Sequence, residues 1–370
     1  MKIIKIGDPK IIMQNPTSKH NYFAWPTVTR LQNGRIAVVA SGFRLSHVCP
    51  FGKAVISYSD DEGETYTYPA PIIDTRLDDR DAGILAFGES GVMVTSFNNS
   101  IEEQKKMAIE PYIDKDESLY RLAYLNTITK EEEEHDLGVT FRTSFDYGKT
   151  FGKIHKCPVS SPHGPIELRN GKILWVGWTN FKDYELPYGC ISAHTVDPES
   201  GKTEYIGRVE DIVIDGEKQL SCEPYAFELE DGTIICHIRV QNYTPPKKRF
   251  TIFQTFSHDG GKTWTKPEQI ISDFSGAPSH IMRHSSGVLI ASYGHRVNPS
   301  GIKVMFSYDN GKTWDFDHDV YVTGDIYDLG YPSTVELSDK SLLTVFYACP
   351  ELCAPAVVWQ QKWKFDNEKG

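Results

Sequence analysis

One pattern recurs six times along the 370-residue chain: an alternating strand, a tight turn and a second apolar strand. Asn-Gly, Asp-Gly and Ser-Gly at the turns favour such hairpins, because a positive φ costs little at these residues. The last copy has Asp339 and Lys340 at its turn, lacks the glycine and is therefore the weakest. The six hairpins span residues 28–42, 84–97, 165–178, 225–239, 280–294 and 333–347.

The spacing of the hairpins indicates a radial repeat. The turns fall near residues 34, 91, 171, 232, 287 and 340, so that all intervals but the second are similar. Evenly spaced units of a few short strands are typical of β-propellers. The longer second interval contains residues 101–136, where charged, helix-favouring residues break the strand rhythm. The sequence therefore predicts an all-β fold, a six-bladed β-propeller in a single domain (1–370), with a short charged insertion around 101–136.

A second repeat lies between the hairpins and reads Ser-x-Asp-x-Gly-x-Thr followed by an aromatic residue. It occurs as SDDEGETY (59–66), SFDYGKTF (144–151), SHDGGKTW (257–264) and SYDNGKTW (307–314). The Asp side chain can accept hydrogen bonds from nearby backbone N–H groups, and the glycine suits a left-handed turn. A calcium loop of the EF-hand type needs twelve residues ending in Glu. We therefore interpret the boxes as structural turns.

The four boxes resemble the Asp-box repeats of the sialidase (neuraminidase) superfamily, also called BNR repeats, which decorate a six-bladed propeller. With the six hairpins, this resemblance covers nearly the whole chain. It implies an exo-acting glycoside hydrolase that needs no metal and no cofactor.

The composition excludes some classes of partner and indicates the cellular compartment. The net charge of −11 offers no basic face to nucleic acid. The first residues reach a Gly-Asp-Pro turn before any apolar run long enough for a signal peptide or a membrane span. Seven cysteines without a CxxC spacing do not indicate a disulfide framework or a zinc knuckle. We expect a cytoplasmic protein, or a secreted one if a leader has been removed, with no nucleic acid or membrane partner; the oligomeric state stays open.

The geometry of a hairpin ring predicts where a ligand site lies. If all six turns lie on one face, the opposite strand ends meet on the other face and form a shared pocket. Three arginines fall at such ends, namely Arg44, Arg239 and Arg296. In an acidic protein, three arginines at equivalent strand ends indicate a clamp for an anion, most naturally a planar carboxylate.

Several of these residues also match the sialidase pattern. Glu223 in CEPYAFELEDG, followed by Arg239, resembles the family's strand that carries the activating Glu and a substrate-binding Arg. Arg296 and Arg44 resemble further arginines of the family, and Tyr331 in LGYPSTVEL resembles its nucleophilic tyrosine. The resemblance implies a retaining reaction on a terminal sialic acid or related 2-keto sugar acid. Tyr331 would attack, Glu223 would take its proton, and the arginines would hold the substrate carboxylate.

Two departures from the pattern concern the clamp and the acid. The family's first arginine is replaced by Ala24 in FAWPTV, so that Arg44 or Arg80 would have to complete the clamp. The family's acid Asp after the first hairpin is missing from RLSHVCPFGK. His47 in that segment could protonate a leaving oxygen, because the pKa of an imidazole suits this work.

Other candidates come from TRLDDRDAG and SPHGPIEL. Asp81 could supply the acid or contact a substrate hydroxyl or amide. Asp79 could bind substrate or simply pair with Arg80. His163 could bind a sugar hydroxyl. The Glu expected after the last hairpin is not obvious, and Glu351 is a displaced candidate.

Three alternatives to a sialidase remain open. One is a hydrolase of another glycan that uses carboxylates from residues 78–81 together with Glu223, and the carboxylate separation would then decide between retention and inversion. A second is a lyase on uronic-acid glycans, with His and Tyr as base and acid. The third is a glycan-binding propeller without catalysis, which would need the arginine clamp but no activated phenol.

Overall fold

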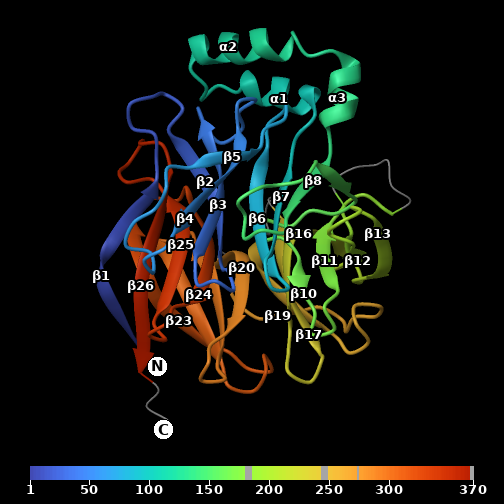
Figure 1. Cartoon of the computed structure of the whole chain (residues 1–370), viewed down its shortest axis with the longest axis vertical. Coiled ribbons are helices and arrows are strands. Elements are labelled where there is room, and N and C mark those ends of the chain that lie inside the picture. The colour runs from blue at the N-terminus through green and yellow to red at the C-terminus, as the bar shows by residue number, and fades with distance from the viewer. Residues whose placement is uncertain (180–185, 243–248, 273–274, 367–370) are drawn as a thin grey trace.

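The computed structural model describes residues 1–179, 186–242, 249–272 and 275–366. It contains six four-stranded antiparallel sheets arranged as the blades of a propeller (Figure 1). Blade 1 consists of β2 (Tyr22–Arg30), β3 (Ile36–Arg44), β4 (Lys53–Ser59) and β5 (Ala70–Ile73). Blade 2 consists of β6 (Arg80–Phe87), β7 (Gly91–Phe97), β8 (Val139–Ser144) and β9 (His155–Cys157). Blade 3 consists of β10 (Ile166–Glu167), β11 (Ile173–Trp178), β12 (Ile191–Val196) and β13 (Thr203–Arg208).

Blades 4 and 5 follow a small two-stranded ribbon, and blade 6 joins the two ends of the chain. The ribbon is β14 (Val213–Ile214) and β15 (Glu217–Lys218). Blade 4 consists of β16 (Leu220–Glu228), β17 (Ile234–Asn242), β18 (Arg249–Ser257) and β19 (Glu268–Gln269). Blade 5 consists of β20 (Ser275–Arg283), β21 (Leu289–His295), β22 (Ser300–Ser307) and β23 (Asp315–Gly324). Blade 6 consists of β24 (Leu329–Glu336), β25 (Leu342–Ala348), β26 (Val357–Asp366) and β1 (Lys2–Met13).

The fold prediction is confirmed. Each of the six hairpins forms the two inner strands of one blade, and the last one closes even without glycine because Lys340 adopts a positive φ of 65°. The first strand of every blade packs against the first strands of both neighbouring blades, so that the ring is continuous. The N-terminal strand β1 is the outer strand of blade 6, where it pairs antiparallel with β26.

The hydrophobic core lies between the blades rather than in one central body. Six clusters of buried residues occur, one at each junction between neighbouring blades. This arrangement follows from the alternation of the strands, because each sheet presents apolar side chains on both faces to its neighbours. At the junction of blades 5 and 6, Trp363 is fully buried and donates from its indole nitrogen to Thr344 Oγ1 at 2.8 Å.

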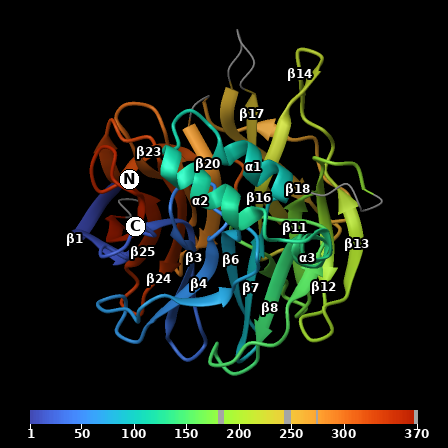
Figure 2. The ribbon, with the colours of Figure 1, turned by 90° about the horizontal axis from the view of Figure 1, so that it is seen from above.

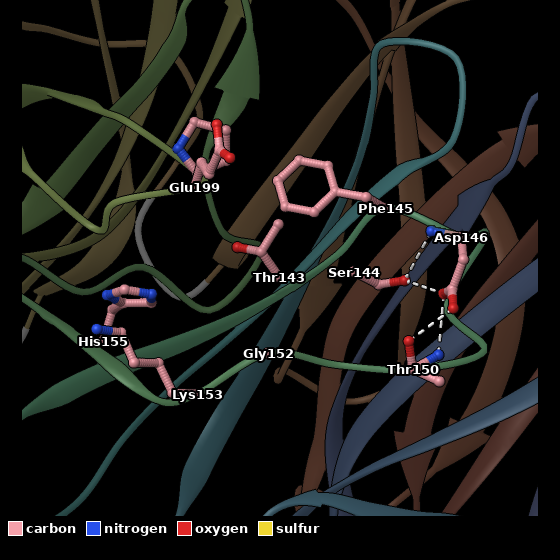
Figure 3. A pocket seen from close by; sticks show the side chains of 10 residues that line it. Thr143, Ser144, Phe145, Asp146, Thr150, Gly152, Lys153, His155 and Glu199 are labelled. Carbon is pink, nitrogen blue, oxygen red and sulfur yellow. Dashed lines mark hydrogen bonds between the residues drawn. The ribbon is translucent and has the colours of Figure 1, made fainter.

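The four boxes are structural turns, as predicted, and connect the third and fourth strands of blades 1, 2, 4 and 5. In blade 2, Asp146 accepts from Ser144 Oγ at 2.6 Å, from Thr150 Oγ1 at 2.6 Å and from the Thr150 N–H at 2.9 Å (Figure 3). A depression of about 380 Å³ lies beside this box, with His155 and Glu199 on its other side. Because β8 pairs antiparallel with β7, the box after β8 lies at the same end as the hairpin turn, and the depression is not the site predicted from the opposite strand ends.

The insertion is helical, as its residues favour. It forms α1 (Ile101–Ala108), α2 (Lys115–Leu125) and α3 (Lys130–Asp136) between β7 and β8. The three helices begin at side-chain caps, Ser100, Asp114 and Thr129. The helices lie over the end of the propeller opposite the hairpin turns, and in the view from above α1 and α2 project across the ring (Figures 1 and 2). No helix in the described ranges is both long and apolar enough to cross a membrane.

The inter-blade core makes a testable prediction. Replacing Trp363 by Ala leaves a cavity at the junction of blades 5 and 6 and should lower the free energy of unfolding by about 3–5 kcal/mol. Urea titration followed by fluorescence measures the change. Leu352→Ala, at an exposed turn position, is the control and should change stability by less than about 0.5 kcal/mol. Equal effects of the two substitutions would contradict this description of the core.

Candidate functional site

Four residues at the helix-covered end of the ring share an unusual backbone conformation. Trp25, Asp81, Glu223 and Tyr331 have φ values of 54°, 48°, 49° and 51°. Each lies at a bulge where the inner strand of its blade slips in register against the second strand. Bulges re-aim side chains, and a positive φ in a bulky residue costs roughly 1–3 kcal/mol, which proteins keep mainly at functional sites. The same device in blades 1, 2, 4 and 6 therefore marks a common site.

Tyr331 and Glu223 meet at this end of the ring. The Tyr331 hydroxyl donates to Glu223 Oε1 at 2.7 Å. Arg239 Nη1 donates to Glu223 Oε2 at 2.6 Å and to the Tyr331 oxygen at 3.1 Å. Burial and the nearby Glu223 charge raise the pKa of Tyr331 well above its ordinary value, whereas Arg239 lowers it. The phenol is therefore neutral at rest, next to a carboxylate that can accept its proton.

Asp81 lies beside Glu223 and is almost completely buried. Burial raises the pKa of Asp81 to about 7, the Arg80 charge opposes this rise, and the Glu223 charge adds to it. Asp81 and Glu223 both line a cavity of about 130 Å³ that also contacts Trp178 and Gln241. Asp81 Oδ1 and the Trp178 indole nitrogen have no hydrogen-bond partner in the structure. A carboxyl group with a pKa near neutrality, open to a cavity, can act as a general acid or base.

The arginine predictions have different outcomes. Arg239 lies in the centre of the site, as described above. Arg80 packs over the Trp25 ring at 4.4 Å, and its Nε has no hydrogen-bond partner. Arg296 donates to the Leu329 carbonyl and, at 3.1 Å, to the Tyr347 hydroxyl. The role of Arg80, Arg239 and Arg296 in an anion clamp stays a prediction.

Arg44 does not belong to this set, which corrects the prediction for it. It is completely buried and forms an ion pair with Asp78. Its remaining N–H groups donate to Ser41 Oγ and to the carbonyls of Ser46, His47 and Asp79. A guanidinium with all five donors engaged in the protein has none left for a ligand.

Asp79 is also a structural residue rather than a substrate contact, and it does not pair with Arg80. Its carboxylate accepts from the Thr75 N–H at 2.6 Å and from Thr75 Oγ1 at 3.0 Å, and it is completely buried. Burial raises the pKa of Asp79 to about 7. Asp79 holds the segment that leads into β6, and the prediction of substrate binding for it is corrected accordingly.

His47 lies at the rim of the site, in the segment between β3 and β4. Its Nδ1 is 3.3 Å from the Tyr22 hydroxyl and its Nε2 is 3.4 Å from Arg80 Nη2. Tyr22 donates its only proton to Asp328 Oδ2 at 3.0 Å, so His47 Nδ1 has to carry a proton and Nε2 accepts from Arg80. Desolvation and the charges of Arg80 and Arg44 lower the pKa of His47 well below its ordinary value. His47 is therefore neutral, which favours Asp81 over His47 as the acid.

His163 is surrounded by buried side chains near the candidate site. It is buried, its Nδ1 is 3.1 Å from Thr27 Oγ1, and its ring packs edge-on against His280 and Tyr225. Tyr225 and His280 stack at 4.7 Å between ring centroids. The His163 ring is thus enclosed by aromatic side chains, and its Nε2 has no hydrogen-bond partner in the structure. A direct contact of His163 with a sugar hydroxyl stays a prediction. Glu351, the displaced candidate, is exposed in the turn after β25.

Tyr22 and Asp328 were missed by the sequence-based prediction of site residues. Trp25 stands before its turn as Glu223 and Tyr331 do before theirs, but the prediction gave it no role. Tyr22 and Asp328 contact each other over 306 positions of sequence, which no local pattern reveals. In the described residues no group of three or more His, Cys, Asp or Glu side chains is arranged to hold a metal ion.

The fold and the repeats define a sialidase-like BNR propeller. Residues 120–345 match the model of the BNR repeat-like domain, and the chain belongs to this family. No curated protein matches the chain.

Similar solved structures include a Dyadobacter fermentans protein of unknown function, with a TM-score of 0.73, 21% identity and coverage of 98% of this chain and 99% of that chain. The NanB sialidase from Streptococcus pneumoniae gives a TM-score of 0.69 at 14% identity, over 97% of this chain and 71% of that one. The intramolecular trans-sialidase from Ruminococcus gnavus gives 0.65 at 12% identity, over 98% of both chains. At these identities the likeness establishes the fold alone.

The pKa of Asp81 predicts how stability depends on pH. A carboxyl whose pKa rises on folding from 3.8 to about 7 stabilises the fold fully below 3.8, and this contribution is lost as the pH rises through 7. Asp81→Asn keeps a neutral group at this position. The stability of the variant relative to wild type should therefore increase from pH 5 to pH 7 and level off above it, as measured by urea titration.

Asp60→Asn provides the control for this titration. Asp60 is exposed and its pKa is lowered, chiefly by its hydrogen bond to Arg35, so its contribution stays constant over the same pH range. A difference between wild type and Asp81→Asn that does not change between pH 5 and pH 8 would show that Asp81 does not titrate there.

Proposed function

We propose that the chain is an exo-acting glycoside hydrolase that removes a terminal sialic acid or a related 2-keto sugar acid with retention of configuration. The observation that carries the proposal is the contact of Tyr331 with Glu223 at 2.7 Å, with Arg239 at 3.1 Å from the same hydroxyl oxygen. A lectin would need the arginines but not a phenol beside a base.

The first step follows from the charges of the reacting groups. The anomeric carbon of a 2-keto sugar acid bears a carboxylate, which a carboxylate nucleophile would approach against like charge. The neutral Tyr331 avoids this repulsion: its oxygen attacks the anomeric carbon while Glu223 takes the phenolic proton. Asp81 gives its proton to the departing glycosidic oxygen.

The second step reverses the proton transfers. Asp81, now ionised, takes a proton from a water molecule that attacks the glycosyl–tyrosine bond at the anomeric carbon. The phenolic oxygen leaves and regains its proton from Glu223. Arg239 lies next to this oxygen throughout and stabilises the charge that develops on it. Net hydrolysis consumes one water molecule, and both carboxyl groups return to their starting states.

Arg80 completes the clamp in place of the arginine that Ala24 replaces. Trp25 is buried beside Ala24, and Arg80 from the next blade packs on its indole. This cation–π contact places the guanidinium of Arg80 next to the site, where its buried Nε lies 3.9 Å from Asp81 Oδ1 and makes no hydrogen bond. Arg80, Arg239 and Arg296 would together bind the substrate carboxylate.

The nucleophile is tested with chromogenic aryl sialosides and a panel of other acidic and neutral aryl glycosides. Tyr331→Phe should lower kcat on the cleaved substrate by at least roughly 10²-fold, because the phenol oxygen forms the covalent bond. Tyr293→Phe, a buried tyrosine in the core between blades 4 and 5, is the matched control and should keep wild-type activity. Full activity of Tyr331→Phe would refute the nucleophile, and binding of sugar acids without turnover of any glycoside would indicate a lectin.

The clamp is tested by binding alone. Arg80→Gln should weaken the binding of free sialic acid about tenfold or more, because a charge-assisted hydrogen bond contributes roughly 1.5–3 kcal/mol. Isothermal titration measures the change. Arg35→Gln removes an arginine that pairs with Asp60 at an exposed position and should leave the affinity unchanged. Unaltered affinity in Arg80→Gln would exclude Arg80 from the clamp.

The state of His47 favours one second candidate, a lyase acting on uronic-acid glycans. A neutral imidazole whose Nε2 faces the arginines could take the proton next to a uronate carboxylate, while Tyr331 protonates the departing oxygen. The product would contain a carbon–carbon double bond that absorbs in the ultraviolet. In the lyase, His47→Gln would abolish turnover. In the hydrolase with Asp81 as acid, the same variant would keep most of kcat and release a saturated sugar.

A further inference from the structure

The segment that carries His47 is held by three arginines from three parts of the chain. It joins β3 to β4 and spans residues 45–52. Arg44 donates to the His47 carbonyl at 2.9 Å and Arg80 donates to the same oxygen at 3.2 Å. Arg121 of α2 donates to the carbonyl of Val48. Successive carbonyls of one loop are thus fixed by side chains of blade 1, blade 2 and the helical insertion.

The side chain of Arg121 is buried, although it belongs to a helix on the outside of the propeller. Its side chain is 1% exposed and contacts Ser46 Oγ and Glu117 besides Val48. Burying a guanidinium costs several kcal/mol unless hydrogen bonds and an opposite charge compensate for it. Glu117, one turn earlier on α2, supplies that charge, and the loop supplies the acceptors. Through Arg121, α2 therefore hydrogen-bonds directly to the backbone of the 45–52 loop.

Aromatic contacts support the same connection. Phe51, near the end of the loop, packs against Tyr120 and Tyr124 of α2, with ring centroids 4.9 Å apart in both pairs. Tyr124 also donates to the Arg76 carbonyl at 3.1 Å. The loop is thus fixed to α2 at two points, one on each side of Cys49.

The insertion leaves and re-enters blade 2, and it is also anchored to residues 74–79, which connect blade 1 to blade 2. Leu77, Ile101 and Leu125 form a small buried cluster beneath the helices. At the end of α3, Asp136 pairs with Arg76 at 2.8 Å. The helices leave β7, cross the end of the ring and return to β8 (Figures 1 and 2). An element rooted in one blade therefore fixes a loop of the neighbouring blade.

We propose that α2 acts as a positioning element for the site and that Arg121 is its key residue, acting on the substrate through the 45–52 loop and Arg80. The proposal rests on the clamp proposed above. Arg80 touches the loop twice, at the His47 carbonyl and at the His47 ring. Fixing the loop therefore fixes Arg80 as well, and a displacement of a binding group by about 1 Å can cost a large factor in binding or rate. Arg121 binds no substrate and does not take part in the chemistry.

The test measures binding and catalysis separately. Arg121→Ala should weaken the binding of free sialic acid about fivefold or more and raise KM by a similar factor, with a smaller change in kcat. Arg121→Lys keeps the charge and one donor and should restore part of the affinity. Lys106→Ala removes an exposed ion pair of α1 with Glu102 and should leave both constants unchanged.

A double-mutant cycle distinguishes positioning from mere stability. If Arg121 acts through Arg80, adding Arg121→Ala to Arg80→Gln should cause little further loss of affinity. Additive losses, or an Arg121→Ala variant that is less stable but binds like wild type, would overturn the proposal. Should Arg121→Ala not fold, Phe51→Leu weakens the same contact and takes its place in the cycle.

A spectroscopic measurement distinguishes a failure of this proposal from a failure of the proposed function. The ¹⁵N signals of the His47 ring report its tautomer without substrate, and they should shift in Arg121→Ala but not in Lys106→Ala. If wild type binds no sugar acid and these signals still shift, the proposed arginine clamp is wrong, but Arg121 still positions the 45–52 loop. If wild type binds sialic acid and the signals do not shift, the positioning role of Arg121 is wrong, and the arginine clamp is unaffected.

Discussion

The closure of the ring by β1 and β26 is the constraint on which the site depends. In the described residues the first strand of each blade packs against the first strands of its two neighbours, so the positions of the inner strands are fixed only when the ring is complete. The seam between blades 6 and 1 runs beside the site, because Tyr331 comes from the first strand of blade 6 and Trp25 from the first strand of blade 1. Their rings lie 6.4 Å apart. The pairing of the two ends of the chain therefore sets the distance between groups that meet at the candidate site.

The bulges at Trp25, Asp81, Glu223 and Tyr331 depend on this closure for their stability. A positive φ at each position costs roughly 1–3 kcal/mol, and it persists only where the surroundings determine the conformation. The inner strands supply such surroundings, since each is hydrogen-bonded on one edge and packed against two other blades. Identical local geometry in four blades thus directs four different side chains to one place, which is how a repeated fold produces a site without symmetry.

The sequence was sufficient for the fold and for part of the site. Turn residues and alternation predicted all six hairpins, and counting back from the turns predicted Glu223, Asp81 and Tyr331 as neighbours. The same count could not show that Arg44 is buried against Asp78, because that ion pair joins two blades. It also could not reveal that burial brings the pKa of Asp81 to about 7, since burial depends on the packing of the whole ring. The pairing of β1 with β26 likewise has no local signal.

The distribution of charge in the candidate site differs from that of the chain as a whole. Arg239 is balanced by Glu223, and Arg44 shares Asp78 with Arg80. Asp81, with its pKa near 7, contributes only a partial negative charge at neutral pH. Arg80, Arg239 and Arg296 nevertheless lie together at this end of the ring, although the chain as a whole carries −11. Because the guanidinium groups are largely withdrawn from water, their field is weakly screened, and they would attract a carboxylate.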